Sequence, residues 1–330
     1  MTENLINTIL KKNKPVIYFH KSEKYFPCNA DFFVKNSILI KDNKMIDTNM
    51  TQTKLYHYSK DKNEHELNEM FIQPIDEKVR YGYRYDYNDS PLYYYVRTEN
   101  EKIYIYFFLF YGYNGSYNIL YIDETGQHYN DVEHFTYEID IKTQKLERIF
   151  FSNHGKKDGI WKNINDVEMD KIERKRPVLY VAKNGHGFYP KSGSIFRVFG
   201  LANDLTDKGH KYDKYDYIQI LNENDKQFDP EKHGWFYSKI RFGIDGTKDI
   251  YLRDYLRKEE EASNLQLVIP EYIYDIVPIL VILFLLFVII GVLEKYMSYN
   301  SKAKRFVYLV FVYTIFVVIV KLIKQMIESF

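Results

Sequence analysis

Four side chains that can bind a metal ion lie within seven positions, in the stretch "GQHYNDVEH" at 126–134. They are His128, Asp131, Glu133 and His134, and they combine imidazole nitrogens with carboxylate oxygens. Such donors suit a divalent cation such as Mg²⁺ or Ca²⁺. On a strand, alternate side chains share a face, so Asp131 and Glu133 point one way and His134 the other. The spacing predicts a metal site, and the solvated start of a strand is the alternative interpretation.

Four further residues are candidates for binding a ligand. His154 and His186 each precede a glycine, which lets the backbone turn sharply or approach a ligand closely. Asp204 and Asp207, in "NDLTD" at 203–207, supply oxygen donors of the kind that hold Ca²⁺. Turns in which these side chains cap the backbone would explain the same pattern without a ligand.

Motifs of several enzyme classes are absent from the sequence. It contains no Gly-x-Ser-x-Gly elbow, no Walker A loop, no Gly-x-Gly-x-x-Gly and no His-Glu-x-x-His. Cys28 is the one cysteine, which excludes a disulfide within the chain, and it lacks a local nucleophile motif. We therefore assign no catalytic residue. A metal-dependent hydrolase, with Glu133 as general base, is the enzymatic alternative.

The elements that would position these residues are β-strands. Aromatic runs separated by turn signals fill residues 15–255. In "FTYEIDI" (135–141), apolar and polar residues alternate, which predicts a strand with one buried and one exposed face. "YNGS", "KTQK" and "KNGHG" are typical of hairpin turns. We predict a mainly β fold, an antiparallel β-sandwich over 13–255 that follows an N-terminal tail at 1–12.

The C-terminal region holds two long apolar runs. Residues 276–293 carry no charge over 18 positions, and as a helix they cover roughly 27 Å, about the thickness of a bilayer core. A second run at 306–323 includes Lys321, whose stem can snorkel. We predict a two-helix transmembrane hairpin within 268–330, joined to the sandwich by a charged linker at 256–267. A buried helical hairpin of a soluble protein is the alternative.

Charge indicates little about partners or orientation. Lys and Arg number 46 against 45 Asp and Glu, so we expect no nucleic-acid partner. Positive charges are equal on the two sides of the predicted hairpin, so they do not orient it. The first residues lack the apolar core of a signal peptide, which favours an integral membrane protein with a cytosolic domain. Sequons at Asn49, Asn88 and Asn114 leave the opposite topology open.

Five stretches between residues 13 and 250 resemble, in order, the motifs of one family. "KPVIYFHKSEKYFPCNADFF" (14–33) is similar to its opening, with His, Glu and a Phe-Pro step. "GQHYNDVEH" resembles its Gly-Asp-Trp-Glu-His element, with Asn130 for Gly and Val132 for Trp. The remaining three stretches are "FFSNHGKKDGIW" (150–161), "RPVLYVAKNGHGFYPKSG" (176–193) and "GLANDLTDKGHKYD" (200–213). The family is that of vacuolar protein sorting-associated protein 62.

The resemblance implies a part in vacuolar protein sorting and protein transport, without an established catalytic reaction. The Asp-Trp-Glu element is also similar to one in necrosis-inducing cytolysins, β-sandwiches that use a divalent metal to engage sphingolipid head groups. We therefore expect a non-catalytic, membrane-anchored β-sandwich of endomembrane trafficking or organisation. Its partners would be the bilayer, through the hairpin, and a lipid head group, glycan or protein. A purely structural membrane protein of an organelle or a viral assembly is a further alternative.

Overall fold

A computed structural model of the protein describes residues 3–119, 123–153, 159–171, 176–195, 203–220, 229, 231–244 and 268–269. The chain divides into two compact units, residues 1–271 and 272–330, and all described residues belong to the first. This unit is mainly β, as the sequence predicts. The prediction of an antiparallel sandwich is wrong in one respect, because three of the strand pairs are parallel.

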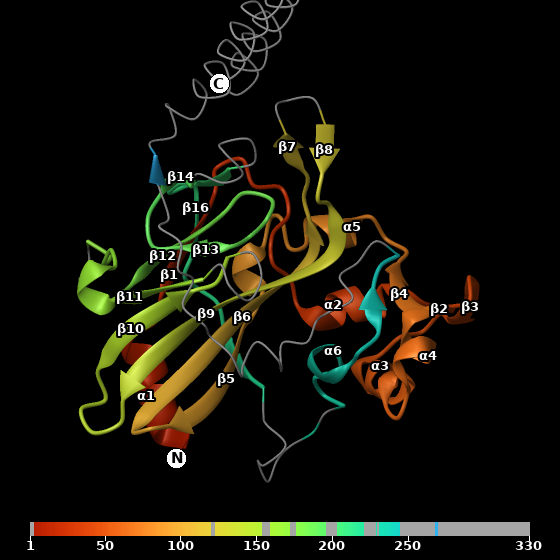
Figure 1. The fold of residues 1–330 in the computed structure, drawn as a ribbon, viewed down its shortest axis with the longest axis horizontal. Coiled ribbons are helices and arrows are strands. Elements are labelled where there is room, and N and C mark those ends of the chain that lie inside the picture. The colour runs from red at the N-terminus through yellow and green to blue at the C-terminus, as the bar shows by residue number, and fades with distance from the viewer. Residues whose placement is uncertain are drawn as a thin grey trace, which may run out of the picture. The chain divides into compact units, whose positions relative to one another are not determined.

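A six-stranded sheet in the order β11-β10-β9-β6-β5-β17 forms the centre of the unit (Figure 1). Its strands are β5 (Leu92–Glu99), β6 (Lys102–Asn114), β9 (His128–Asp140), β10 (Leu146–Phe151), β11 (Ile160–Asn163) and β17 (Tyr217–Gln219). Neighbouring strands run antiparallel, except that β17 is parallel to β5. The long aromatic runs of the sequence thus form the two longest strands, β6 and β9.

A second sheet, ordered β13-β12-β1-β16, lies across one face of the central sheet. It contains β1 (Val16–Phe19), β12 (Val178–Val181), β13 (Phe188–Tyr189) and β16 (His210–Tyr212), with β1 parallel to β12. Phe107 and Phe135 of the central sheet and Phe19 of β1 belong to the core cluster between them. Helix α1 (Glu3–Lys12), in the stretch predicted as a tail, buries Ile6, Ile9 and Leu10 in this cluster.

Helices and a third sheet cover the other face. The sheet is ordered β18-β4-β2-β3. Figure 1 shows β2, β3 and β4 gathered with α2, α3, α4 and α6 on one side of the long strands. The elements are α2 (Ala30–Lys35), β2 (Ser37–Lys41), β3 (Lys44–Asp47), α3 (Gln52–Ser59), α4 (Glu64–Asn68), β4 (Met70–Pro74), α5 (Lys78–Tyr81), α6 (Gly234–Tyr237) and β18 (Arg241–Phe242). A second core cluster lies between these elements and the central sheet, and it contains Phe108 and Phe110 of β6 together with Trp235. A strand covered on both faces is continuously apolar, which explains "FFLFY" in β6.

The structure also overturns the exposed face predicted for residues 135–141. Thr136 and Glu138 point away from Phe135 and Tyr137, yet they are only 0% and 4% exposed. Arg148, opposite Glu138 on β10, donates two hydrogen bonds to the Glu138 carboxylate, at 2.9 and 2.5 Å. The polar residue of the alternating pattern is therefore a buried, paired carboxylate.

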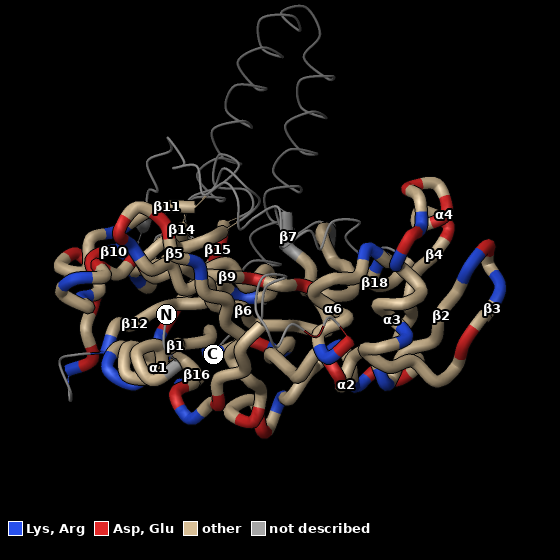
Figure 2. The backbone as a smooth tube through the Cα atoms, turned by 90° about the horizontal axis from the view of Figure 1, so that it is seen from below, with Lys and Arg blue, Asp and Glu red and all other residues tan. Residues whose placement is uncertain are grey.

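Smaller elements complete the description. A three-stranded sheet joins β14 (Gly193–Ile195), β15 (Asp204–Thr206) and β19 (Val268–Ile269), and β7 (Tyr117–Ile119) pairs with β8 (Asp123–Thr125). Strand pairing thus extends beyond residue 255, the predicted end of the sandwich. The 3₁₀ turns are η1 (Tyr87–Asp89) and η2 (Ile164–Asp166). Lys and Arg alternate with Asp and Glu along the described chain (Figure 2).

None of the helices in the described ranges is long and apolar enough to cross a membrane. The predicted spans at 276–293 and 306–323 and the linker at 256–267 lie outside those ranges. The transmembrane hairpin therefore stays a prediction from the sequence.

Candidate functional site

Two residues singled out in separate motifs, Asp131 and His186, meet at one end of the central sheet. Asp131 lies on β9 opposite Tyr111 of β6, and His186 lies in the turn between β12 and β13. Asp131 Oδ2 is 2.9 Å from His186 Nδ1. The second ring nitrogen, Nε2, is 3.0 Å from the carbonyl oxygen of Tyr25. The imidazole thus joins three segments that are far apart in the sequence.

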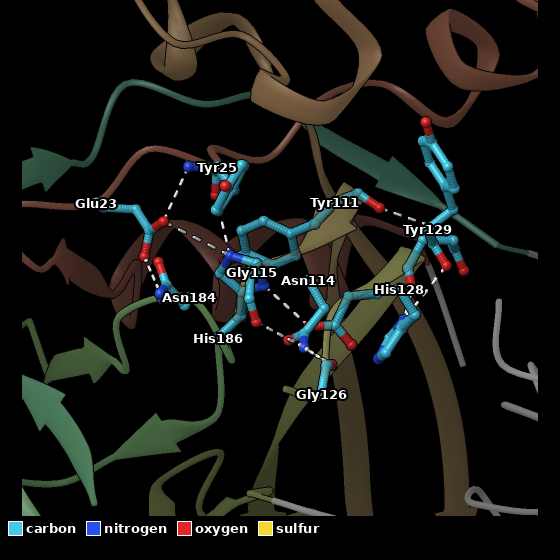
Figure 3. A network of polar contacts seen from close by, with 12 residues as sticks. Glu23, Tyr25, Tyr111, Asn114, Gly115, Gly126, His128, Tyr129, Asn184 and His186 are labelled. Atoms are coloured by element: carbon cyan, nitrogen blue, oxygen red, sulfur yellow. Dashed lines mark hydrogen bonds and ion pairs between the residues drawn. The ribbon is translucent and has the colours of Figure 1, made fainter. Parts of the chain in front are cut away.

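Glu23 completes the network, and Figure 3 shows it on the Tyr25 side of His186. Its Oε1 accepts from the backbone N–H groups of Lys24 (2.8 Å) and Tyr25 (2.9 Å), and its Oε2 from that of Asn184 (2.8 Å). Oε1 also lies 3.9 Å from His186 Nε2, with both side chains fully buried. Site reasoning from the sequence missed Glu23, although it belongs to the His-Glu step of the 14–33 motif.

The His186 ring is held at both of its nitrogens. Its partners are a carboxylate oxygen and a peptide carbonyl oxygen. Two carboxylates, those of Asp131 and Glu23, lie 2.9 and 3.9 Å from this buried imidazole.

The backbone at His186 is held in an unfavourable conformation. Its φ is 55°, in the left-handed region that costs a non-glycine residue roughly 1–2 kcal/mol. The Tyr111 ring stacks on the imidazole with centroids 3.8 Å apart and planes 6° from parallel. This stacking, together with the two hydrogen bonds, stabilises the strained turn. Such strain persists where the surroundings determine the conformation strongly.

His128 and Asn130 shape the strand next to Asp131. His128 Nδ1 lies 2.8 Å from the carbonyl oxygen of Asn130, so this nitrogen donates to the backbone. Asn130 is buried with φ 57°, and its side-chain amide donates to the carbonyl of Tyr111 at 3.3 Å. Asparagine tolerates positive φ better than most residues, which explains why it can stand where the family motif has glycine.

Glu133 and His134 lie on opposite faces of β9. Glu133 is opposite Leu109, on the face of Asp131. His134 packs near Phe108 and Phe150, and its burial lowers the pKa of its imidazole to about 4. The residues that the structure describes contain no group of three His, Cys, Asp or Glu side chains placed to hold a metal ion. The assignment of Mg²⁺ or Ca²⁺ to His128, Asp131, Glu133 and His134 stays a prediction.

The other candidate ligands have separate positions. Asp204, in β15, accepts a hydrogen bond from the Tyr189 hydroxyl and is buried. Asp207 accepts from the backbone N–H of Lys21 at 2.8 Å and lies 3.5 Å from His20 Nε2. His154 lies outside the described residues. Of the predicted ligand-binding residues, His186 is the one that the structure shows bonded to a predicted metal ligand, Asp131.

Tyrosine rings surround the outer end of this network. Tyr25, whose carbonyl holds His186, stacks its ring on Tyr81 at 5.9 Å and contacts Tyr113 at 5.1 Å. The guanidinium of Arg80 lies over the rings of Tyr113 and Tyr129, 5.1 Å from each centroid. The Arg80 Nε donates to the Tyr129 hydroxyl at 3.0 Å, and this bond raises the pKa of the guanidinium.

Several solved structures resemble this chain at low sequence identity. Among solved structures, the chain is similar to NLPPya in complex with glucosamine, at 10% identity over 79% of this chain and 92% of that one (TM-score 0.41). It is also similar to the non-toxic HaNLP3 protein, at 12% identity over 80% and 94% (TM-score 0.40). A third match is the Necrosis and Ethylene inducing Protein 2 from the causal agent of cocoa's Witches Broom disease, at 14% identity over 63% and 72% (TM-score 0.32).

No match is found among curated protein sequences. The family model of vacuolar protein sorting-associated protein 62 matches residues 1–230, which is more than half of the chain. The chain therefore belongs to the vacuolar protein sorting-associated protein 62 family.

Proposed function

We propose that the protein is a non-catalytic binding protein of an endomembrane, anchored by its C-terminal hairpin. Its folded unit would recognise a lipid head group, glycan or protein at the end of the central sheet that carries His186. Family membership supports a part in sorting or organisation of that membrane.

One observation carries the non-catalytic assignment: both ring nitrogens of His186 bond to groups inside the protein. A general base or nucleophile partner needs a nitrogen that faces the substrate. Here the imidazole instead fastens three segments, those of Glu23, Asp131 and the turn at 182–187. A binding surface requires such fixed loops, because ordering them on binding would cost affinity.

A combined assay on the full chain, purified in phosphatidylcholine nanodiscs, tests this proposal. Metal content is measured first, and then binding and turnover on panels of phospholipids, glycans and glycosides. We expect saturable binding of one ligand class without turnover. Turnover that disappears in Glu133→Gln while binding persists would contradict the proposal and establish the hydrolase alternative. Absence of binding to every panel would contradict a lipid head group or a glycan as the ligand, and would leave a protein ligand or a purely structural role.

A further inference from the structure

Strand β3 is an edge strand that exposes two neighbouring apolar side chains. In the sheet ordered β18-β4-β2-β3 it pairs with β2 alone among the described strands. Its sequence is "KMID", and Met45 and Ile46 are 62% and 50% exposed. Figure 1 and Figure 2 both show β3 at the outer border of the described unit. An edge strand carries unpaired N–H and C=O groups, so a further strand can add to it.

Exposed apolar side chains are concentrated on this sheet. Six large ones are exposed among the described residues: two on β3, two that follow β4 and β18 of the same sheet, and two tyrosines. A single exposed apolar residue needs no explanation, whereas neighbouring ones on an unpaired edge indicate a contact with another chain.

The register of β3 on β2 determines the face on which each side chain lies. The two charged residues, Lys44 and Asp47, lie opposite odd-numbered residues of β2, and Met45 lies opposite an even-numbered one. Because opposite residues share a face and successive residues of β2 alternate, both charged side chains lie on one face and Met45 lies on the other. Ile46 is the extra residue of β3 at a register shift in this pairing.

The ends of β3 are held in place. The turn that precedes it, Asp42–Asn43, has φ values of 50° and 58°, the positive sign that a type I′ hairpin turn requires at both positions. At the other end, the Asp47 carboxylate accepts from Lys54 Nζ at 2.8 Å and from the Tyr58 hydroxyl at 3.1 Å. The hydrogen bond from Lys54 lowers the pKa of Asp47, so this carboxylate stays charged. A strand fixed in this way loses little freedom when it associates.

We propose that β3 pairs antiparallel with β3 of a second copy of this chain. The sequence Lys-Met-Ile-Asp is complementary to itself in that orientation: Lys44 of one copy lies opposite Asp47 of the other, and Met45 lies opposite Ile46. Lys44 thereby joins Lys54 beside the same carboxylate. A shift by one residue in either direction would place a charged residue opposite an apolar one, so the charged ends select this register. The contact is isologous, and each pairing occurs twice.

The expected dimer is reversible. An edge contact between four-residue strands is small, which is typical of a transient association and not of an obligate one. Anchoring of both copies in one membrane, as in the proposed function, would raise their effective concentration. The contact does not depend on that function, because β3 and the turn that carries His186 belong to different sheets.

Sedimentation velocity of the full chain in detergent micelles, over a wide range of protein concentration, tests the association. We expect an equilibrium between monomer and dimer. Ile46→Lys should abolish the dimer, whereas Ile75→Lys, the same change at an exposed isoleucine that follows β4, should leave it intact. Lys44→Glu should weaken dimerisation about tenfold, because a like charge then meets Asp47 twice in the symmetric contact. Lys44→Arg keeps the charge and should retain the parent's affinity.

Disulfide formation tests the register. Residues directly opposite on paired strands are close enough for a disulfide, so a mixture of Met45→Cys and Ile46→Cys proteins should form more cross-linked dimer than either protein alone. The native Cys28 is buried, which raises the pKa of its thiol and keeps it from competing. A parent protein that stays monomeric at every concentration, or a dimer that persists in Ile46→Lys, would overturn the inference without affecting binding at the His186 network. Equal cross-linking in the mixture and in the separate proteins would overturn the register.

Discussion

At the scale of single residues, Asp131, a candidate metal ligand in the 126–134 motif, joins distant segments of the fold through its contact with His186. Asp131 has a side chain that is 13% exposed, and its partner His186 is fully buried. An unpaired imidazole N–H in such surroundings is costly, since water cannot replace the lost acceptor. The sequence motifs identify His186 and Asp131 as candidates. They cannot identify the third partner, because the carbonyl of Tyr25 belongs to the backbone and does not depend on the residue type.

Asp131→Ala should therefore destabilise the fold instead of behaving as a surface change. We expect the free energy of unfolding to fall by about 3 kcal/mol, because the buried imidazole of His186 loses a hydrogen-bond partner that water cannot replace. Urea unfolding followed by circular dichroism measures it. Glu101→Ala serves as the control, since Glu101 and its partner Lys142 are each 72% exposed, and it should change stability little. Equal effects of the two substitutions would show that the His186 contact stabilises nothing.

His134 should make stability depend on pH. In the unfolded chain its imidazole takes up a proton near pH 6.5, but in the folded protein burial holds the pKa at about 4. The unfolded state thus binds the extra proton between these values, so stability is complete above pH 6.5 and falls as the pH drops toward 4. The loss of stability between pH 7 and 4.5 should be about 2 kcal/mol smaller in His134→Leu than in the parent protein. An equal loss in the two proteins would show that burial of His134 does not cause the pH dependence.

At the scale of elements, close backbone contacts decide where α5 lies. Gly112 of β6 faces this helix, and a Cβ there would be 2.0 Å from the Val79 carbonyl oxygen. The aromatic periodicity of residues 102–116 predicts β6 but gives no reason for its one glycine. That reason is the approach of a helix distant in sequence, which the local pattern does not contain.

Gly112→Ala should displace α5 and with it Arg80. We expect a loss of about 2 kcal/mol in the free energy of unfolding, typical of an overpacked contact with backbone. Lys78→Ala, an exposed change on the same helix, should leave the stability intact. A normal stability of Gly112→Ala would mean that α5 does not pack where the structure places it.

The alternation of apolar and polar residues predicts where strands form, but it does not predict which faces of the sheet other elements cover. Alternation over 135–141 predicts β9 correctly, because a period of two reports only that the two faces differ. It cannot show that the polar face is covered, since Glu138 is buried by a pairing with Arg148 that lies on the next strand. Likewise, residues 1–12 look only like a short helical or frayed start, because the apolar residues of α1 are buried in a cluster with residues more than a hundred positions later, such as Tyr137.

At the scale of the whole molecule, the boundary of the folded unit lies later than the sequence pattern indicates. Because β19 pairs with β14, a chain that ends after residue 271 should keep its β-rich circular dichroism and stay soluble without detergent. A chain that ends at residue 255 lacks β19 and should unfold at lower urea. A mainly helical spectrum of the 1–271 chain, or its need for detergent, would contradict this division.

The side of the membrane on which the folded unit lies can be tested by glycosylation of its natural sequons, and the structure shows which sequon is accessible. Asn114 is buried and donates to the Gly126 carbonyl at 2.8 Å, so it is a poor acceptor for a glycan in the folded protein. Asn49 is exposed. If the domain is cytosolic, Asn49 should stay unmodified in a eukaryotic host, whereas a mobility shift removed by an N-glycosidase would place the domain in a lumen.

The pairing of β1 has a consequence for how the chain is made. Val16 pairs with Val178 and Ile17 with Tyr212, so the first strand of the protein waits for the last part of its sheet to be synthesised. At about 5–20 residues per second, the interval between β1 and β16 is about 10–40 s on the ribosome. During this time "VIYF" is an unpaired apolar segment, the kind that chaperones hold. The nascent protein should therefore be most prone to aggregation when translation stalls before residue 212.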